Sequence, residues 1–358
     1  MLNKKIKTIS FHVTLDGMGG VNWEGANGNK DAFVKAMIDL GLSPNVTNQK
    51  VKNIKWHKAN YYIRDGKMVH VLKISADCIR HQMAGAKNSA ITLIDSVWAE
   101  YLASNEALVR GYFFPKEGEI TTKRKSPLSV TDAEETSGAV SMIESKSASG
   151  VRNDTSYFQQ ETFGSTVWEF TITLNLSELQ FIPASDIYDR RAVPRHLENT
   201  MLQKYREKFG DVKDGYYKMK YASVDIPEYG YMLPQSAVRT LVNWYADTVR
   251  NIYILDATSH AKYVKMTVSA LDEDNNLVDN FDLNSDYEVC SQYAEGDKAK
   301  YEVAKVEVER QLVESNKAAK DAKKKAEKEA KAKAKAKKEA EEQAKKEAEE
   351  KEATEESA

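Results

Sequence analysis

The sequence predicts an α+β protein built around a mainly antiparallel sheet. Apolar and polar residues alternate in the first segment, with apolar positions at Ile9, Phe11, Val13 and Leu15. This two-residue period is typical of a half-buried strand. A hairpin is expected over residues 60–63 and 68–75, because Asp65-Gly66 is a strong hairpin dipeptide. Hairpins, helices and separated strands then follow in mixed order, which favours α+β over a doubly wound parallel sheet.

The first strand ends in Asp16-Gly17-Met18-Gly19-Gly20, where we expect a tight turn. Glycines after a first strand can also hold a pyrophosphate group. Here Asn22 stands where that motif requires its third glycine, and no helical pattern follows. The sequence therefore argues against a dinucleotide site.

Periodicity and capping residues place the remaining elements. Ser75 is well placed to cap a helix that begins at Ala76. Further helices are expected over residues 88–103, 195–208 and 234–250. Further strands are expected over residues 108–115, 167–176 and 264–271.

A long polar excursion, residues 123–164, separates two of these strands. It begins with the basic triplet Lys123-Arg124-Lys125 and Ser126, and it also carries Lys146, Arg152 and the aromatic pair Tyr157-Phe158. Cations and aromatic side chains on one flexible segment suit a finger that contacts a phosphate backbone and separates bases. We therefore expect a nucleic-acid contact in this segment.

Charge is unevenly distributed along the 358 residues, whose formal net charge is −2. Residues 317–338 hold 11 lysines and 3 acidic residues, whereas residues 339–358 hold 3 lysines and 9 glutamates. The rest of the chain is mildly acidic, which is not the usual composition of a nonspecific nucleic-acid binder. Binding to RNA would therefore need a local basic groove.

The composition also changes near residue 300, which predicts a folded region, 1–300, and a tail, 301–358. From Lys317 onward Ala, Lys and Glu dominate without Gly or Pro, and no apolar stripe is available for burial. A solvated helix and a disordered tail both remain open.

No catalytic or metal-binding pattern stands out. The six histidines lack metal-ligand spacing, and runs of carboxylates such as Asp272-Glu273-Asp274 are typical of solvated loops. Cys78 and Cys290 are expected to be free thiols in a reducing cytoplasm. No run of about 18 apolar residues predicts a membrane span. We expect a cytoplasmic, non-catalytic binding protein without a cofactor or metal.

Eight short strings spread over residues 6–195 resemble, in the same order, the backbone subunit of Cascade-type CRISPR complexes. This is the Cas-seven family of the RAMP superfamily, and the chain looks closest to the minimal type I-F variant form. The strings are Val21-Asn22-Trp23-Glu24-Gly25, Ile74-Ser75 with Cys78-Ile79-Arg80-His81, Leu108-Val109-Arg110-Gly111-Tyr112, Lys123-Arg124-Lys125-Ser126-Pro127-Leu128, Arg152-Asn153-Asp154-Thr155-Ser156-Tyr157-Phe158, Thr162-Phe163-Gly164, Leu179-Gln180-Phe181-Ile182 and Asp189-Arg190. One departure is Ala84-Gly85, where the family usually carries bulkier residues.

The resemblance implies a hand-shaped protein. An RRM-like (ferredoxin-like) palm would carry an inserted finger or web and a thumb hairpin near residues 132–164. The implied partners are guide RNA (crRNA), identical subunits in a helical filament, other Cascade subunits, and target DNA through guide pairing. The protein would hold the guide and leave sequence recognition to base pairing.

The residues that match the family's strings or lie in the thumb segment are expected to bind RNA. Arg80 and His81 would lie in the first turns of a helix, where N–H groups and the helix dipole favour phosphate. Trp23 could stack a base or belong to the core, and Tyr157 and Phe158 could wedge the duplex or anchor the returning strand. The full set is Trp23, Arg80, His81, Arg110, Lys123, Arg124, Lys125, Ser126, Lys146, Arg152, Tyr157 and Phe158.

Two other functions stay open. Related subunits of type III systems cut target RNA in a metal-dependent reaction with a thumb aspartate, and Asp132 or Asp154 could fill that role. The other alternative is a structural protein that oligomerises through its charged C-terminal segment, although this segment lacks an apolar heptad repeat.

Overall fold

The computed structural model describes most of the chain before residue 296 and seven positions beyond it. The described residues are 5–21, 54–55, 57–64, 66–84, 95–114, 121–139, 141–147, 157–185, 191–221, 224–255, 259–295, 303, 306, 307, 310, 313, 314 and 317. The strands are β1 (Lys5–Met18), β2 (Ile54–Lys55), β3 (Ala59–Arg64), β4 (Lys67–Ile74), β5 (Tyr112–Phe114), β6 (Thr122–Arg124), β7 (Leu128–Val130), β8 (Ala133–Glu135), β9 (Ser141–Ser147), β10 (Tyr157–Phe163), β11 (Ser165–Asn175), β12 (Phe181–Pro183), β13 (Lys213–Tyr221), β14 (Val224–Met232), β15 (Tyr253–Leu255), β16 (His260–Asp272), β17 (Glu288–Val289) and β18 (Ala294–Glu295). The helices are α3 (Ala76–Ala84), α4 (Asp95–Leu102), α5 (Asn105–Arg110), α6 (Leu176–Gln180), α7 (Glu198–Phe209) and α8 (Gln235–Arg250), with a 3₁₀ turn at Arg195–Leu197.

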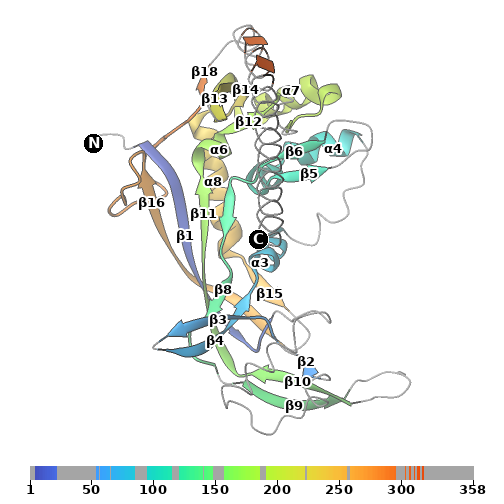
Figure 1. The fold of residues 1–358 in the computed structure, drawn as a ribbon, viewed down its shortest axis with the longest axis vertical. Helices are drawn as coiled ribbons and strands as arrows, with labels where there is room; N and C mark the ends of the chain where they lie inside the picture. The colour runs from blue at the N-terminus through green and yellow to red at the C-terminus, as the bar shows by residue number, and fades with distance from the viewer. Residues whose placement is uncertain are drawn as a thin grey trace, which may run out of the picture. The chain divides into compact units, whose positions relative to one another are not determined.

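Within these ranges, nine strands form the main sheet (Figure 1). Their order is β15-β16-β1-β11-β8-β4-β3, with β17 also paired to β1 and β7 to β11. β1 lies between β16 and β11 and runs antiparallel to both, so that Phe11 pairs with Ile172 on one side and Val268 on the other. The pairing of β17 with β1 is parallel, and the other described pairings in this sheet are antiparallel. The predicted α+β class and mainly antiparallel sheet are confirmed.

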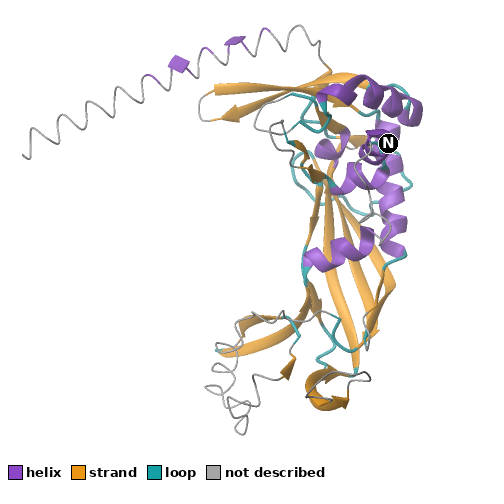
Figure 2. Ribbon diagram, turned by 90° about the vertical axis from the view of Figure 1, so that its right-hand side faces the viewer, coloured by secondary structure: helices purple, strands orange, loops and turns teal. Residues whose placement is uncertain are grey.

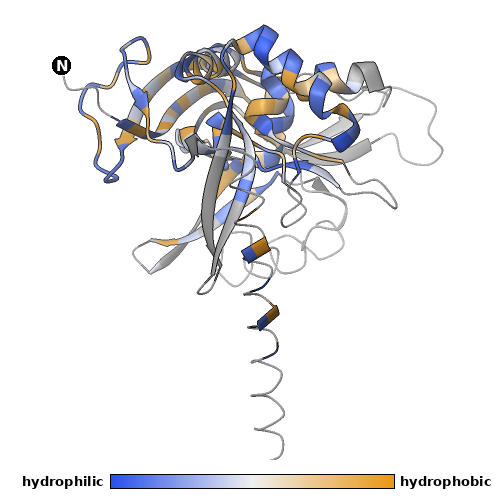
Figure 3. Cartoon of the chain, turned by 90° about the horizontal axis from the view of Figure 1, so that it is seen from above, coloured by the Kyte–Doolittle hydropathy of each residue, from blue (hydrophilic) through white to orange (hydrophobic). Residues whose placement is uncertain are grey.

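The core lies between the main sheet and the helices that cover one of its faces (Figure 2). Ile9, Phe11, Val13 and Leu15 of β1 are almost fully buried there. α8 packs on β16, and its Tyr245 ring lies 6.2 Å from the ring of Phe11. Burying a large apolar side chain stabilises the fold by about 1.5–3 kcal/mol, so the alternation in β1 is a main source of stability. Figure 3 shows polar and apolar residues alternating around these helices.

Three smaller sheets complete the described structure. Their strand orders are β2-β10-β9, β12-β14-β13-β18 and β5-β6. The chain divides into two compact units, residues 1–215 with 229–295, and residues 216–228 with 296–358. In the second unit, the seven described positions from 303 to 317 are helical. Among the described residues, no helix has the length and apolar character needed to cross a membrane.

Several predicted elements are present. The hairpin hinged at Asp65-Gly66 is β3–β4, with Ile63 paired to Met68. The helix after Ser75 is α3, and the helices expected over 195–208 and 234–250 are α7 and α8. The predicted strands at 167–176 and 264–271 are β11 and β16. Of the helix expected over 88–103, the described part is α4, and residues 88–94 lie outside the described ranges.

Two predictions are wrong in detail. The tight turn expected from Asp16 does not begin there, because β1 continues to Met18. Gly17 is needed inside this strand, since a Cβ there would lie 2.2 Å from the carbonyl oxygen of His260 on β16. The strand expected over 108–115 is instead the end of α5 followed by β5. Ser104 caps α5 by accepting a hydrogen bond from the N–H of Ala107, and Gly111 ends it.

The polar excursion of residues 123–164 is more regular than the sequence suggests. It contains β6, β7 and β8, followed by the antiparallel pair β9–β10. β10 is followed after Gly164 by β11 of the main sheet. An antiparallel strand pair, with β2 added in parallel to β10, therefore occupies the part of the chain where the resemblance implies a thumb.

Replacing Gly111 by Ala should lower the free energy of unfolding by about 3 kcal/mol, because two penalties coincide. Gly111 has φ of 72° and ψ of 175°, a backbone conformation that is nearly limited to glycine and costs a residue with a side chain about 1–3 kcal/mol. Its Cβ would also lie 2.5 Å from the carbonyl oxygen of Arg124, which adds overpacking. Gly138→Ala is the matched control, since Gly138 has φ of 75° but open space around it, and should cost only about 1 kcal/mol. Urea unfolding of both variants checks this, and equal losses would contradict the proposed clash.

Candidate nucleic-acid interface

Arg124 points into the protein, which corrects the expectation that it contacts phosphate. β6 alternates, so Thr122 and Arg124 are buried while Lys123 between them is partly exposed. Arg124 is only 3% exposed. Its guanidinium donates hydrogen bonds of 2.6 to 3.2 Å to four backbone carbonyl oxygens, those of Leu108, Glu178, Leu179 and Phe181.

These carbonyls belong to two helix ends. Leu108 lies in the last turn of α5, and Glu178 and Leu179 lie in α6, with Phe181 directly after it. The last carbonyls of a helix lack partners within the helix and carry its negative dipole end, so a cation there is stabilising. Burial lowers the pKa of the Arg124 guanidinium, although arginine stays protonated in proteins. We call this arrangement the Arg124 clamp.

The neighbours of Arg124 on either side face outward, as a phosphate contact would require. Lys123 places its ammonium over the ring of Phe113, 5.6 Å from the centroid. The Lys125 side chain is exposed and its ammonium lies 2.5 Å from the carboxylate of Glu178. Ser126 is less available, since its hydroxyl donates to the carbonyl of Leu128 and accepts from the N–H of the same residue.

Arg80 of α3 and Arg110 of α5 lie in one small cavity, although they are 30 positions apart in the sequence. Arg110 makes a 2.8 Å ion pair with Glu106, and Arg80 lies 3.8 Å from Asp77. The Nε atom of Arg80 is buried without a hydrogen-bond partner. Two predicted cations are thus brought together, each held by one carboxylate.

The segments that carry these cations and the two lysines beside Arg124 lie next to one another. A Cβ on Gly111, directly after Arg110, would lie 2.7 Å from the backbone nitrogen of Ser126, so the end of α5 touches the segment that follows β6. Leu128, two residues further, lines the cavity that holds Arg80 and Arg110. We call Arg80, Arg110, Lys123 and Lys125 the cationic strip.

The N-terminus of α3 is occupied by a carboxylate from another part of the chain, which corrects the expected phosphate site there. Asp132 accepts a 2.9 Å hydrogen bond from the N–H of Ala76 and a 2.9 Å bond from the ammonium of Lys73. Burial alone would raise the pKa of Asp132, but the bonds from Lys73 and Ala76 outweigh it and lower the pKa. Arg80 and His81 lie in the second half of α3, so they would act through their side chains.

The predicted thumb residues can be placed only in part. Lys146 of β9 pairs in register with Phe158 of β10, and Tyr157 pairs with Ser147. The side chains of Lys146, Tyr157 and Phe158 lie outside the described part of the structure, as do the whole residues Trp23, Arg152 and Asp154.

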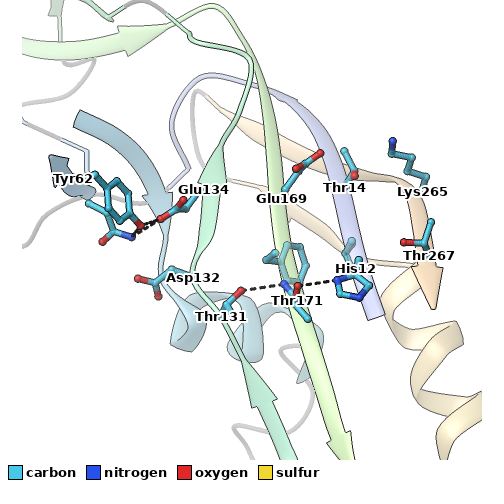
Figure 4. A pocket seen from close by; sticks show the side chains of 13 residues that line it. His12, Thr14, Tyr62, Thr131, Asp132, Glu134, Glu169, Thr171, Lys265 and Thr267 are labelled. Atoms are coloured by element: carbon cyan, nitrogen blue, oxygen red, sulfur yellow. Dashed lines mark hydrogen bonds between the residues drawn. The ribbon is translucent and has the colours of Figure 1, made fainter. Parts of the chain in front are cut away.

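The face of the main sheet that carries His12 bears an open groove of about 640 Å³ with a largely polar lining among the described residues (Figure 4). His12 stands on it, with its ring nitrogens 3.1 Å from the hydroxyl of Thr171 and 2.9 Å from that of Ser269. Glu134 accepts hydrogen bonds from Asn60 and Tyr62. The ionisable groups lining this groove are His12, Asp132, Glu134, Glu169 and Lys265, and their balance is acidic. The groove offers hydrogen bonds rather than phosphate neutralisation.

The described residues show no cluster of three or more His, Cys, Asp or Glu that could hold a metal ion. Asp132, a candidate for metal-dependent RNA cleavage, has one carboxylate oxygen bonded to Ala76 and the other to Lys73. A divalent ion would have to displace both bonds. The geometry therefore gives no support to Asp132 as a metal ligand.

Two aromatic residues near the cationic strip were missed by the sequence analysis. Trp244 of α8 lines the cavity of Arg80 and Arg110 and a neighbouring groove of about 430 Å³. Phe113 of β5 is 58% exposed and lies beside Lys123. Neither residue is marked as functional by its sequence neighbours, because Trp244 lies in an amphipathic helix and Phe113 lies in the apolar run Tyr112-Phe113-Phe114.

Arg124→Met should lower the free energy of unfolding by about 3–5 kcal/mol, because three buried carbonyls and one half-buried carbonyl lose a charged donor. Lys125→Met removes the exposed cation next to it and should change stability by less than about 1 kcal/mol. Urea unfolding curves for the two variants measure the difference. A loss below about 1 kcal/mol for Arg124→Met would show that the clamp is not needed.

Comparison with known proteins identifies the family. The family model described as "Type I-Fv CRISPR-associated protein Cas7fv-like" matches residues 5–305. No curated protein matches. Similar solved chains occur in a "CRISPR RNA-guided surveillance complex" (10% identity, 79% of this chain and 94% of that chain covered, TM-score 0.26), a "CRISPR RNA-guided surveillance complex, pre-nicking" (10%, 86% and 89%, 0.29) and a "Type IV-B CRISPR Complex" (11%, 65% and 92%, 0.25). The family model covers most of the chain, and this chain belongs to the Cas7fv-like family of type I-Fv CRISPR-associated proteins.

Proposed function

We propose that this chain is the guide-RNA-binding backbone subunit of a type I CRISPR surveillance complex. The observation that carries the proposal is the family match over residues 5–305. Identical subunits would assemble along the spacer of the guide in a helical filament, together with other Cascade subunits. The guide would then be held for pairing with target DNA, without catalysis by this chain.

The order of strands and helices supports an RRM-like palm. The chain runs from β1 through α3, α4 and α5 to β7, then β11, α8 and β16, a β-α-β-β-α-β sequence when the other elements are set aside. These strands lie in the order β16-β1-β11-β7, as expected for a ferredoxin-like sheet. The pair β9–β10 leads into β11 and would be the thumb.

The cationic strip is the proposed contact with the guide backbone. Contacts to phosphate fix the position of a strand without reading its sequence, which suits a subunit that must accept any guide. Arg80, Arg110 and Lys125 each have a carboxylate partner now. The pairs of Arg80 and Lys125 each include an exposed side chain, and such pairs are worth little and exchange readily for phosphate, whereas the Arg110–Glu106 pair is half-buried. Ser126, His81 and the hairpin residues Lys146, Arg152, Tyr157 and Phe158 stay proposed contacts, as does Trp23. Arg124 is left out because its donors are used inside the protein.

A double variant tests the strip without disturbing the fold. Replacing all of residues 123–125 would confuse loss of binding with loss of structure, since Arg124 is buried. Lys123→Ala with Lys125→Ala should instead weaken binding to single-stranded guide RNA. The slope of log affinity against log salt should fall by about 1.4, because each phosphate contact on a single strand contributes about 0.7. Fluorescence anisotropy over a salt series measures this slope.

The matched control removes two exposed lysines elsewhere, Lys262→Ala with Lys265→Ala on β16. Its slope should stay closer to that of the wild type. If the salt slope fell in the Lys262/Lys265 double variant but stayed at the wild-type value in the Lys123/Lys125 double variant, the RNA would contact β16 rather than the cationic strip. If the wild-type chain failed to bind guide RNA even with its complex partners, the proposed function itself would be wrong.

A further inference from the structure

Phe113 is a large apolar side chain presented to solvent by a firmly held strand. β5 alternates, so Tyr112 and Phe114 turn inward and Phe113 turns outward with 58% of its surface exposed. The Tyr112 hydroxyl donates a 2.7 Å hydrogen bond to the carbonyl of Ala192. The Phe114 ring packs 4.5 Å from the ring of Trp98. The exposed ring therefore stands on a support that packing has fixed.

The partner strand β6 is held equally well. Arg124 anchors its inner side through four carbonyls, and the backbone N–H of Lys123 donates a 2.9 Å bond to the carbonyl of Arg191. Phe113 and Lys123 are direct partners in the β5–β6 register. The outer side of this two-stranded ribbon thus presents one aromatic ring and one cation at a fixed spacing, with Lys125 directly after the strand.

We propose that Phe113 stacks an unpaired base of the bound RNA strand while Lys123 contacts a phosphate next to that base. The Lys123 ammonium lies over the ring, 5.6 Å from its centroid. A cation–π contact at an exposed site is weak, so a phosphate can draw the ammonium away and leave the ring face to a base. Stacking on an aromatic ring is tolerant of sequence because every base has a π face. The inference rests on the proposed function and assigns a base-stacking position within it.

A solitary exposed apolar residue would not by itself carry this inference, since such residues are common on protein surfaces. Tyr253 of β15 is the matched comparison: it is 52% exposed and pairs in register with Lys262. What favours Phe113 is that the ammonium of its partner Lys123 lies 5.6 Å from the ring centroid and that the exposed Lys125 follows directly after the strand. An aromatic face beside backbone-binding cations is the arrangement by which proteins hold single-stranded nucleic acid.

The test compares Phe113→Ala, Phe113→Trp and Tyr253→Ala in the full chain, using labelled single-stranded guide RNA and anisotropy. Phe113→Ala should weaken binding about 5- to 140-fold, the range expected for one stacked base. The salt slope should stay unchanged, because no phosphate contact is removed. Phe113→Trp keeps an aromatic face and should bind at least as tightly as the wild type. Tyr253→Ala should bind like the wild type.

The outcomes separate this inference from the proposed function. If the wild type binds RNA and Phe113→Ala binds equally well, the stacking position is wrong and the proposed function stands. A lower salt slope in Phe113→Ala would also overturn it, since the ring would then act only by placing Lys123. If Phe113→Ala instead alters self-association of RNA-free protein in light scattering while RNA affinity is unchanged, the ring is a protein contact. Absence of RNA binding by the wild type would reject both proposals.

Discussion

The Arg124 clamp fixes the geometry on which the proposed interface depends. One guanidinium joins the ends of α5 and α6 to β6, so three segments from different parts of the chain share a single buried cation. Its donors satisfy carbonyls that no helix could satisfy by itself. Because strand residues alternate, burying Arg124 also forces Lys123 toward the opposite side. The inward residue therefore determines where the outward cation stands.

The two faces of the main sheet differ in polarity. One face is covered by helices and holds the apolar core, including Phe11 and Tyr245. The other presents hydroxyls around His12 and an acidic balance of ionisable groups. RNA-binding sheets of the RRM type stack bases on aromatic residues of their open face, but His12 is the aromatic side chain that β1 offers there. The cationic strip lies instead on α3, α5 and β6, which favours an RNA path along these elements.

The sequence predicted elements whose signals are local and missed those decided by tertiary contacts. The alternation in β1 and the Asp65-Gly66 hinge need no knowledge of the rest of the chain, and both predictions were right. Leu108-Val109 and Tyr112-Phe113-Phe114 are apolar on both sides of Arg110-Gly111, so periodicity could not divide this run between α5 and β5. The sequence identifies 123–125 as a basic segment, but which residue turns inward depends on the end of α5 and on that of α6, which lies more than 50 positions away. Trp244 and Phe113 become candidate contacts only because the folded chain places them beside cations.

The carboxylate partners of the strip give the proposed RNA binding by a mildly acidic chain a source of selectivity. Asp77, Glu106 and Glu178 hold Arg80, Arg110 and Lys125, which reduces the field that a passing polyanion meets. Phosphate must compete with each carboxylate, so a contact at a single cation gains little free energy. The binding free energy adds up when one RNA strand contacts several cations of one subunit and then those of the next subunit, because the later contacts form within the same complex. A guide held by many copies of this chain would therefore bind far more tightly than any one copy could hold it.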